Sequence, residues 1–118
     1  MARVLVVDDE DVLLEMVAIV IEDLGHEPLL ASDGHEALSL LNAEKRLPAL
    51  MISDVMMPHM NGIDLVQAIR REARFQHMPI ILMSAANQPA AYALADKFIH
   101  KPFELDDLEQ LIENLISS

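Results

Sequence analysis

Acidic or polar side chains follow four separate apolar runs of the chain. The runs and the residues that end them are Val4–Val7 with Asp8 and Asp9, Ala49–Ser53 with Asp54, Ile80–Met83 with Ser84, and Phe98–His100 with Lys101. Short apolar runs of this kind are typical of buried strands. The carboxyl ends of parallel strands share one edge of a sheet, where open α/β folds bind ligands. The sequence therefore predicts a site that contains carboxylates, a hydroxyl and an ammonium group.

These side chains suit a divalent metal. Hard cations such as Mg²⁺ prefer oxygen ligands, which Asp9 and Asp54 can supply as carboxylates. Asp8 can act directly or through water, and a backbone carbonyl near Met56 can help. The three carboxylates and the Lys101 ammonium sum with a divalent cation to zero charge. Without the cation the carboxylates repel one another, and we expect at least one pKa to rise.

The same group of residues suits phosphoryl transfer. A carboxylate is a known nucleophile for phosphoryl groups, and this chemistry depends on positioning and on charge stabilisation at the phosphoryl oxygens. The metal, Lys101 and the Ser84 hydroxyl could each contact one oxygen. Taken singly, an Asp at a strand end is more often a helix cap, and Ser84 could begin a turn. The joint pattern at successive strand ends is hard to explain as caps.

Strand and helix patterns alternate along the whole chain. The expected strands are Arg3–Val7, Pro28–Ala31, a run ending at Asp54, a run opened by Pro79, and Phe98–His100. The expected helices are Val12–Leu24, one that begins at Asp33 or Gly34, one after Gly62, and Glu104–Ile116. This alternation predicts an α/β fold, a doubly wound parallel sheet of five strands with helices on both faces. In the first helix, the residues predicted to form the apolar face are Val12, Leu13, Met16, Val17, Val20 and Leu24.

Composition limits the possible functions. The 118 residues suit one domain, and 53% hydrophobic residues suffice for a core. A net charge of −12 disfavours direct nucleic-acid binding. The absence of cysteine excludes disulfides and thiolate metal sites, and the five histidines form no metal-ligand pattern. No membrane span or signal peptide is evident, so we expect a cytoplasmic protein without membrane contact.

Four segments together resemble the receiver domain of bacterial two-component response regulators, the CheY-like superfamily. They are Val4–Glu10, Ser53–Gly62, Met83–Ala85 and Lys101–Phe103. The resemblance covers essentially the whole chain and implies one receiver domain over residues 1–118. It also implies the flavodoxin-like strand order 2-1-3-4-5 and a cis peptide bond at Lys101–Pro102.

The resemblance further implies a role for each site residue. Asp54 would accept a phosphoryl group from a histidine kinase or a histidine phosphotransfer protein, and an unidentified downstream protein would bind the phosphorylated form. Mg²⁺, for which Mn²⁺ is expected to substitute, would be the cofactor. The implied metal ligands are Asp8, Asp9, Asp54 and the Met56 carbonyl; Lys101 would pair with the phosphoryl group, and Ser84 and Phe98 would act as the switch.

The chain departs from the family pattern before the last strand. Lys101 stands only 17 positions after Ser84, and typical members are longer here by about five residues, roughly one and a half helical turns. We therefore predict a short or irregular fourth helix between Asn87 and Asp96. That face normally carries dimerisation and output, so we expect a monomer or a weak dimer.

A second departure concerns loss of the phosphoryl group. Met56 stands two positions after Asp54, and Ala86 two positions after Ser84. Neither side chain can hydrogen-bond an attacking water well, so slow self-hydrolysis is the hypothesis.

Other classes of function stay open at this stage. No output domain follows Ser118, so the chain is a stand-alone receiver or a receiver from a longer protein. A degenerate receiver that works as an unphosphorylated interaction module is one alternative. A Mg²⁺-dependent aspartyl-phosphate phosphohydrolase is another, although Met56 occupies the position where such an enzyme needs an acid-base carboxylate.

Overall fold

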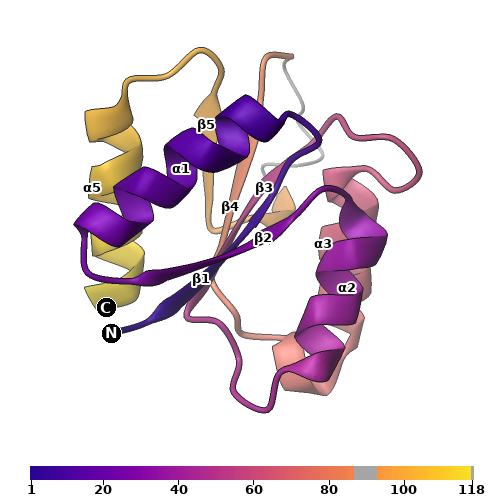
Figure 1. The fold of residues 1–118 in the computed structure, drawn as a ribbon. Coiled ribbons are helices and arrows are strands. Elements are labelled where there is room, and N and C mark those ends of the chain that lie inside the picture. The colour runs from indigo at the N-terminus through magenta and orange to yellow at the C-terminus, as the bar shows by residue number, and fades with distance from the viewer. Residues whose placement is uncertain (87–92, 118) are drawn as a thin grey trace.

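The computed structural model describes residues 1–86 and 93–117, and Figure 1 shows their arrangement. The strands are β1 (Arg3–Val7), β2 (Glu27–Ala31), β3 (Leu50–Asp54), β4 (Ile80–Ser84) and β5 (Lys97–His100). The helices are α1 (Asp11–Asp23), α2 (Gly34–Ala43), α3 (Gly62–Arg71), the short 3₁₀ helix η1 (Ala73–Phe75) and α5 (Leu105–Ser117). The predicted elements are thus present, and their ends differ from prediction by a residue or two.

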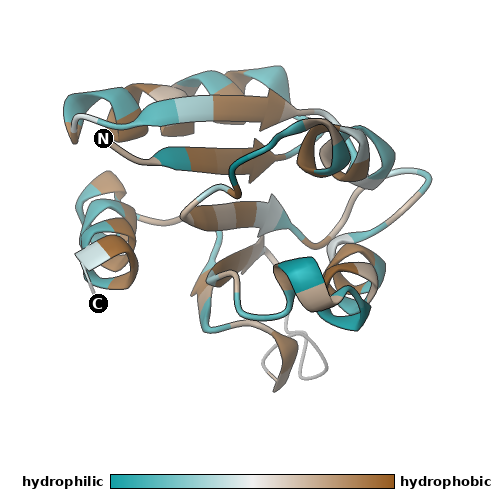
Figure 2. Cartoon of the chain, turned by 90° about the horizontal axis from the view of Figure 1, so that it is seen from below, coloured by the Kyte–Doolittle hydropathy of each residue, from teal (hydrophilic) through white to brown (hydrophobic). Residues whose placement is uncertain are grey.

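The strands form one parallel sheet of five strands in the order β2-β1-β3-β4-β5. This confirms the predicted doubly wound fold and its strand order. Helices α1 and α5 cover one face of the sheet, and α2 and α3 cover the other (Figures 1 and 2). Because all four strand pairings are parallel, every strand ends at the same edge of the sheet.

The core has two parts, one on each face of the sheet. Along β1, Val4 and Val6 pack toward α1 and α5, while Leu5 and Val7 pack toward α2 and α3. Strands β3 and β4 are buried over their whole length. Central strands that are covered on both faces read as continuous apolar runs, which explains why they could be recognised in the sequence.

Helix α1 buries most of the predicted apolar face but not all of it, because Val17 and Val20 are buried and Leu13 and Leu24 pack against the core. Val12 and Met16 were expected in the core but are 69% and 40% exposed. The residues that it buries are Leu14, Val17, Ala18, Val20 and Ile21. The helix is apolar around most of its circumference, so its periodicity could not separate Val12 and Met16 from the buried residues. Together with Ile19, which is 58% exposed, Val12 and Met16 form an apolar row on the solvent side of the helix.

The helix ends follow local capping chemistry. The side chain of Asp33 accepts a hydrogen bond from the Glu36 backbone amide at the start of α2, which confirms the predicted start. After α1, the amides of Gly25 and His26 donate to the carbonyls of Glu22 and Ile21. This is a Schellman motif, in which Gly25 has a φ of 85° that suits glycine.

The segment before β5 was predicted to be irregular from Asn87 to Asp96. Residues 87–92 lie outside the described part of the chain, so that prediction stays open there. Ala93 and Leu94 are helical, and residues 95–96 form a bend. The bend is held by Asp96, whose carboxylate accepts hydrogen bonds from the Ile80 amide at 2.8 Å and from Arg70 at 3.2 Å. Strand β5 thus starts from a fixed point beside β4.

The peptide bond between Lys101 and Pro102 is cis, as expected. Among the helices that the structure describes, none has both the length and the apolar character needed to cross a lipid bilayer.

Candidate functional site

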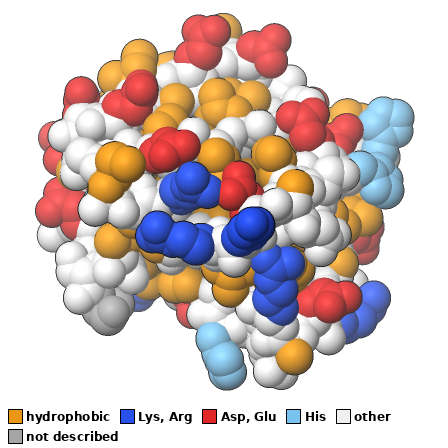
Figure 3. Space-filling view, turned by 60° about the horizontal axis from the view of Figure 1, so that its bottom comes forward, with side chains coloured by type: hydrophobic (Ala, Val, Ile, Leu, Met, Phe, Trp, Pro, Cys, Tyr) orange, Lys and Arg blue, Asp and Glu red, His pale blue; other side chains and the backbone are white. Residues whose placement is uncertain are grey.

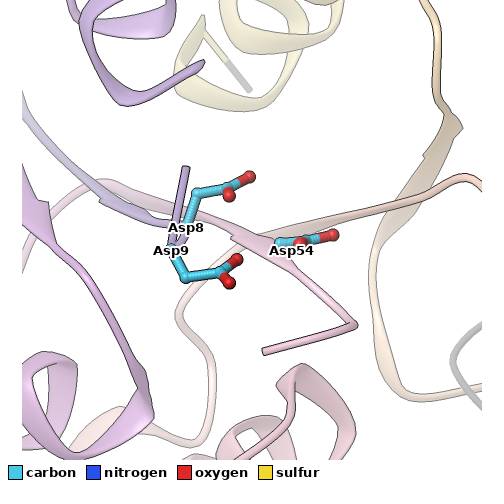
Figure 4. Close-up of side chains that lie close together, drawn as sticks. All are labelled: Asp8, Asp9 and Asp54. Atoms are coloured by element: carbon cyan, nitrogen blue, oxygen red, sulfur yellow. The ribbon is translucent and has the colours of Figure 1, made fainter. Parts of the chain in front are cut away.

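The carboxyl edge of the sheet brings three carboxylates together. Asp8 and Asp9 follow the end of β1, and Asp54 is the last residue of the adjacent strand β3. One oxygen of each carboxylate lies within 4.8 Å of those of the other two. Figure 4 shows the three side chains pointing to the same side of this edge. The predicted convergence of strand ends is therefore correct.

Lys101 connects two of these carboxylates. Its Nζ lies 3.1 Å from Oδ2 of Asp8 and 3.3 Å from Oδ1 of Asp54. Its backbone amide donates to the carbonyl of Ser84 at 2.9 Å, so the parallel pairing of β4 and β5 positions the lysine. The ammonium thus stands where it can contact a group bound to Asp54.

These charges are buried, and burial shifts their pKa values. Asp8 is fully buried and Asp54 is 4% exposed. Loss of solvation raises the pKa of Asp8, against hydrogen bonds from the Glu10 amide and Lys101. Loss of solvation also raises the pKa of Asp54, and the charge of Asp8 adds to this effect. The predicted rise is present, but burial is its main cause and repulsion is secondary.

The pKa of Lys101 is also raised, but its carboxylate partners cause this rise and burial opposes it. Burial alone would lower its pKa, but the hydrogen bond to Asp8 and the charges of Asp54 and Asp8 together raise it. The lysine therefore stays protonated and shares its charge between two carboxylates. One ammonium cannot neutralise Asp8, Asp9 and Asp54, and the site keeps a negative excess.

The loop after Asp54 folds back onto the strand end. Gly62 begins α3, and its amide donates to the carbonyl of Val55 at 2.8 Å. A Cβ on Gly62 would lie only 2.3 Å from the Asp54 carbonyl oxygen. Only glycine permits this approach of α3 to the backbone of Asp54. Asn61 caps the same helix by accepting from the Asp64 amide.

The other predicted site residues, Ser84, Met56 and Phe98, differ in burial and in position relative to the three carboxylates. Ser84 is fully buried, and its Oγ accepts a hydrogen bond from the Ala86 amide at 3.1 Å. Met56 is 61% exposed and lines a pocket of about 280 Å³ with Asp9, Asp54 and Lys101. Phe98 is half-buried and stands edge-on to His100, with ring centroids 5.0 Å apart. It lies on β5 opposite Leu82, further from the strand end than Ser84.

Sequence reasoning missed Glu10 as a member of the site. Its carboxylate lies 3.7 Å from Nζ of Lys101, and its amide donates to Oδ1 of Asp8 at 2.9 Å. The signal was present in the run Asp8-Asp9-Glu10, but the first two positions alone were assigned. Glu10 orients Asp8 and adds a fourth negative charge at the rim.

The donor set fits a hard divalent cation. Three carboxylates offer oxygens at spacings that one ion can span, and hard cations such as Mg²⁺ take oxygen ligands. The excess of negative charge and the raised pKa values of Asp8 and Asp54 mean that a cation would relieve a real electrostatic cost.

Comparison with known proteins agrees with the geometry. Residues 4–113 match the family described as response regulator receiver domain. The chain is 38% identical to response regulator Rre1 of Synechocystis sp. The match covers 96% of this chain and 51% of that protein. The chain is 33% identical to a chemotaxis protein CheY homolog of Campylobacter jejuni, over 98% and 93% of the two chains.

A solved structure shows the same likeness. Vibrio cholerae chemotaxis protein CheY4 superposes with a TM-score of 0.88 at 32% identity, covering 98% of both chains. The chain spans about half the length of the first curated relatives that it matches. With its fold, its acidic site and these relatives in agreement, the chain belongs to the response regulator receiver domain family of two-component signalling.

Proposed function

We propose that residues 1–118 act as a phosphoacceptor receiver domain and that Asp54 is the residue phosphorylated. The observation that carries this proposal is the position of Asp54. It is buried at a strand end, opens onto a pocket, and lies 3.3 Å from the Lys101 ammonium. The donor would be a phosphohistidine on a histidine kinase or a histidine phosphotransfer protein.

The proposed reaction needs little from the protein beyond positioning and charge. A carboxylate oxygen of Asp54 attacks phosphorus, the bond to the histidine nitrogen breaks, and that nitrogen leaves with its electron pair. Lys101 is placed to pair with a phosphoryl oxygen, and Ser84 would contact another oxygen as the switch residue. Burial strengthens each electrostatic contact, because the effective dielectric constant is lower there than in water.

Mg²⁺, when bound, would neutralise charge and polarise the phosphoryl oxygens. Asp8, Asp9, Asp54 and the carbonyl of Met56 are the residues proposed to hold it, and Mn²⁺ should substitute. Asp8 is preset for this role, because the Glu10 amide holds one of its oxygens.

The surface beside the site suits a protein donor better than a small-molecule substrate. A groove of about 330 Å³ runs from the start of α1 to the segment after Lys101, and its apolar lining includes Leu13, Met16 and Phe103. Val12 on α1 and Met56 on the site loop expose further apolar surface. Exposed apolar area next to a charged site is typical of an interaction surface. Met16→Asp should slow transfer from a phosphorylated donor protein and leave phosphorylation by acetyl phosphate unchanged.

Signalling to a downstream protein would depend on a change in the protein surface after phosphorylation. The phosphoryl group adds charge and acceptor oxygens, and movement of Ser84 toward it would free space that Phe98 could enter. A downstream protein would then bind the phosphorylated form.

Mass spectrometry tests the proposal directly. The protein is incubated with Mg²⁺ and acetyl phosphate or phosphoramidate, beside the variant Asp54→Asn. A gain of one phosphoryl group in the wild type alone is expected. Absence of any gain, with Mg²⁺ binding confirmed separately, would overturn phosphorylation and favour an unphosphorylated interaction module.

We further propose slow self-hydrolysis of the phosphorylated form. Met56 and Ala86 both line the pocket, and neither offers a group that can orient a water. The double variant Met56→Asn, Ala86→Glu should lose phosphate roughly tenfold faster, equivalent to about 1.4 kcal/mol in barrier height. The rate is followed by loss of the phosphorylated mass after the phosphodonor is removed. Faster loss from the wild type would contradict the hypothesis.

A further inference from the structure

The basic residues of this acidic protein are concentrated at the edge of the sheet opposite the candidate site. The chain has eight Lys and Arg residues. Lys101 lies at the carboxyl edge, and the other seven begin a strand, precede one or end α3: Arg3, Lys45, Arg46, Arg70, Arg71, Arg74 and Lys97. Figure 3 shows Lys and Arg side chains gathered across the middle of this face, with most of the acidic side chains in view around them.

Three of these cations have structural partners. Arg3 pairs with Glu44 at 2.5 Å, and Arg74 donates to the backbone carbonyl of Glu44. Arg70 pairs with Asp96 at 3.2 Å and donates to the carbonyl of Met78 at 2.8 Å. These contacts join the starts of β1, β4 and β5 to the ends of α2 and α3. The edge is therefore one continuous surface, and these three residues maintain it.

Four cations remain exposed without a partner. They are Lys45, Arg46, Arg71 and Lys97, and within the described residues none of their side chains makes an ion pair or a hydrogen bond. Lys45 follows Glu44, and Lys97 follows Asp96, so both stand beside the paired groups. We call these four residues the free basic cluster. Its positive charge is available to a partner.

Helix dipoles favour part of this distribution but do not require it. The helices of a parallel α/β fold end at this edge, where cations are favourable. Among the four α-helices that the structure describes, only α3 has basic residues in its last turn. Helix α1 instead ends with Glu22 and Asp23. The dipole therefore permits cations at this edge without requiring them, and it does not by itself explain why they gather here.

We propose that the free basic cluster is a docking surface for an acidic segment of a partner protein. Arg46 and Arg71 supply guanidinium groups that bind carboxylates in bidentate geometry, and the lysines add point charges beside them. The paired arginines hold the surface in shape. This surface lies at the opposite edge from Asp54, so a partner could bind it without covering the phosphoacceptor.

The charge of the rest of the molecule favours a compact acidic segment over a nucleic acid. Outside this edge, the chain carries most of its 20 carboxylates and only one cation, Lys101. Screening leaves a repulsive field within about 8 Å of those carboxylates at physiological ionic strength. A short segment that fits on the cluster avoids this field. A longer polyanion that extends beyond the cluster meets it.

Binding of a labelled octaglutamate peptide tests the proposal. The wild type is compared with Lys45→Gln, Arg46→Gln, Arg71→Gln, Lys97→Gln, and thermal unfolding confirms that the variant is folded. Fluorescence anisotropy is measured at low and physiological salt. We expect salt-dependent binding to the wild type, weakened at least about tenfold in the variant, as loss of several exposed ion pairs implies.

Two further arms make each outcome decisive. The matched control Glu109→Gln, Glu113→Gln on α5 removes acidic charge outside the cluster and should keep peptide binding. A single-stranded oligonucleotide of similar charge should bind more weakly than the peptide. Absence of peptide binding, equal binding by the fourfold variant, or tighter binding of the oligonucleotide would each overturn the proposal.

Discussion

The two edges of the sheet treat charge in opposite ways. At the carboxyl edge, Asp8 and Asp54 are almost completely buried and share the ammonium of Lys101. At the amino edge, the free basic cluster is exposed to water (Figure 3). The first edge is a closely packed site with shifted pKa values. The second is an open surface with screened charges.

This difference separates chemistry from recognition. A buried charge interacts strongly with the few groups that it contacts, because little water screens it. An exposed charge acts weakly on folding but remains available to an incoming surface. Changes at the carboxyl edge should therefore affect stability and reactivity together, whereas changes at the free basic cluster should affect binding alone.

The largest effect is expected from Gly62→Ala. The new Cβ would meet the Asp54 carbonyl oxygen at 2.3 Å, and backbone cannot move aside as a side chain can. We expect a loss of about 3 kcal/mol in the free energy of unfolding, measured by chemical denaturation. Gly34→Ala is the control, because its Cβ would meet only the flexible side chain of Met60, and it should stay within about 1 kcal/mol of the wild type. Equal losses would refute the special role of Gly62.

Lys101→Met should have the next largest effect. It leaves the buried carboxylates of Asp8 and Asp54 without their cation, and we expect a loss of about 2 kcal/mol in metal-free solution. Added Mg²⁺ should stabilise this variant more than the wild type. A cation that binds the folded state adds stability, and in the variant the Lys101 ammonium no longer competes with it for the carboxylates. The exposed counterpart Lys97→Met should change stability by less than about 0.5 kcal/mol. A similar loss in both variants would remove the contrast between the edges.

Asp54→Asn should stabilise the metal-free protein at neutral pH, by on the order of 1 kcal/mol. The pKa of Asp54 is raised on folding from its ordinary value of 3.8, so the folded state holds this proton more tightly than the unfolded state. The contribution of Asp54 to stability therefore falls as pH rises from that value through the raised pKa. Denaturation of both proteins with a chelator present should show a stability difference that opens across this window and closes below it. A difference that does not depend on pH would contradict the shift.

The smallest effect on stability is expected at the free basic cluster. Lys45→Gln, Arg46→Gln should shift the free energy of unfolding by less than about 0.5 kcal/mol, because exposed charges without partners contribute little. The same variant should be phosphorylated as the wild type is. A loss of stability above about 1 kcal/mol in the same denaturation assay would contradict this, because it would mean that these two side chains make strong contacts in the folded protein.

Much of the site could be predicted because strand ends are local features. Asp8, Asp54, Ser84 and Lys101 each close an apolar run, and parallel pairing brings such residues to one edge. The exposure of Val12 and Met16 on α1 could not be predicted, because a helix that is apolar on nearly all sides does not mark the limits of its buried face. Glu10 was missed because its role depends on Lys101, far away in the sequence.

The sequence by itself determined the order of elements, the fold class and the residues able to do chemistry. These follow from short-range patterns of apolar, capping and acidic residues. Only the tertiary structure decided which charges are buried, where Lys101 stands between Asp8 and Asp54, and that seven cations share the opposite edge. Burial and long-range pairing depend on how distant segments pack, and no local pattern of residues contains that information.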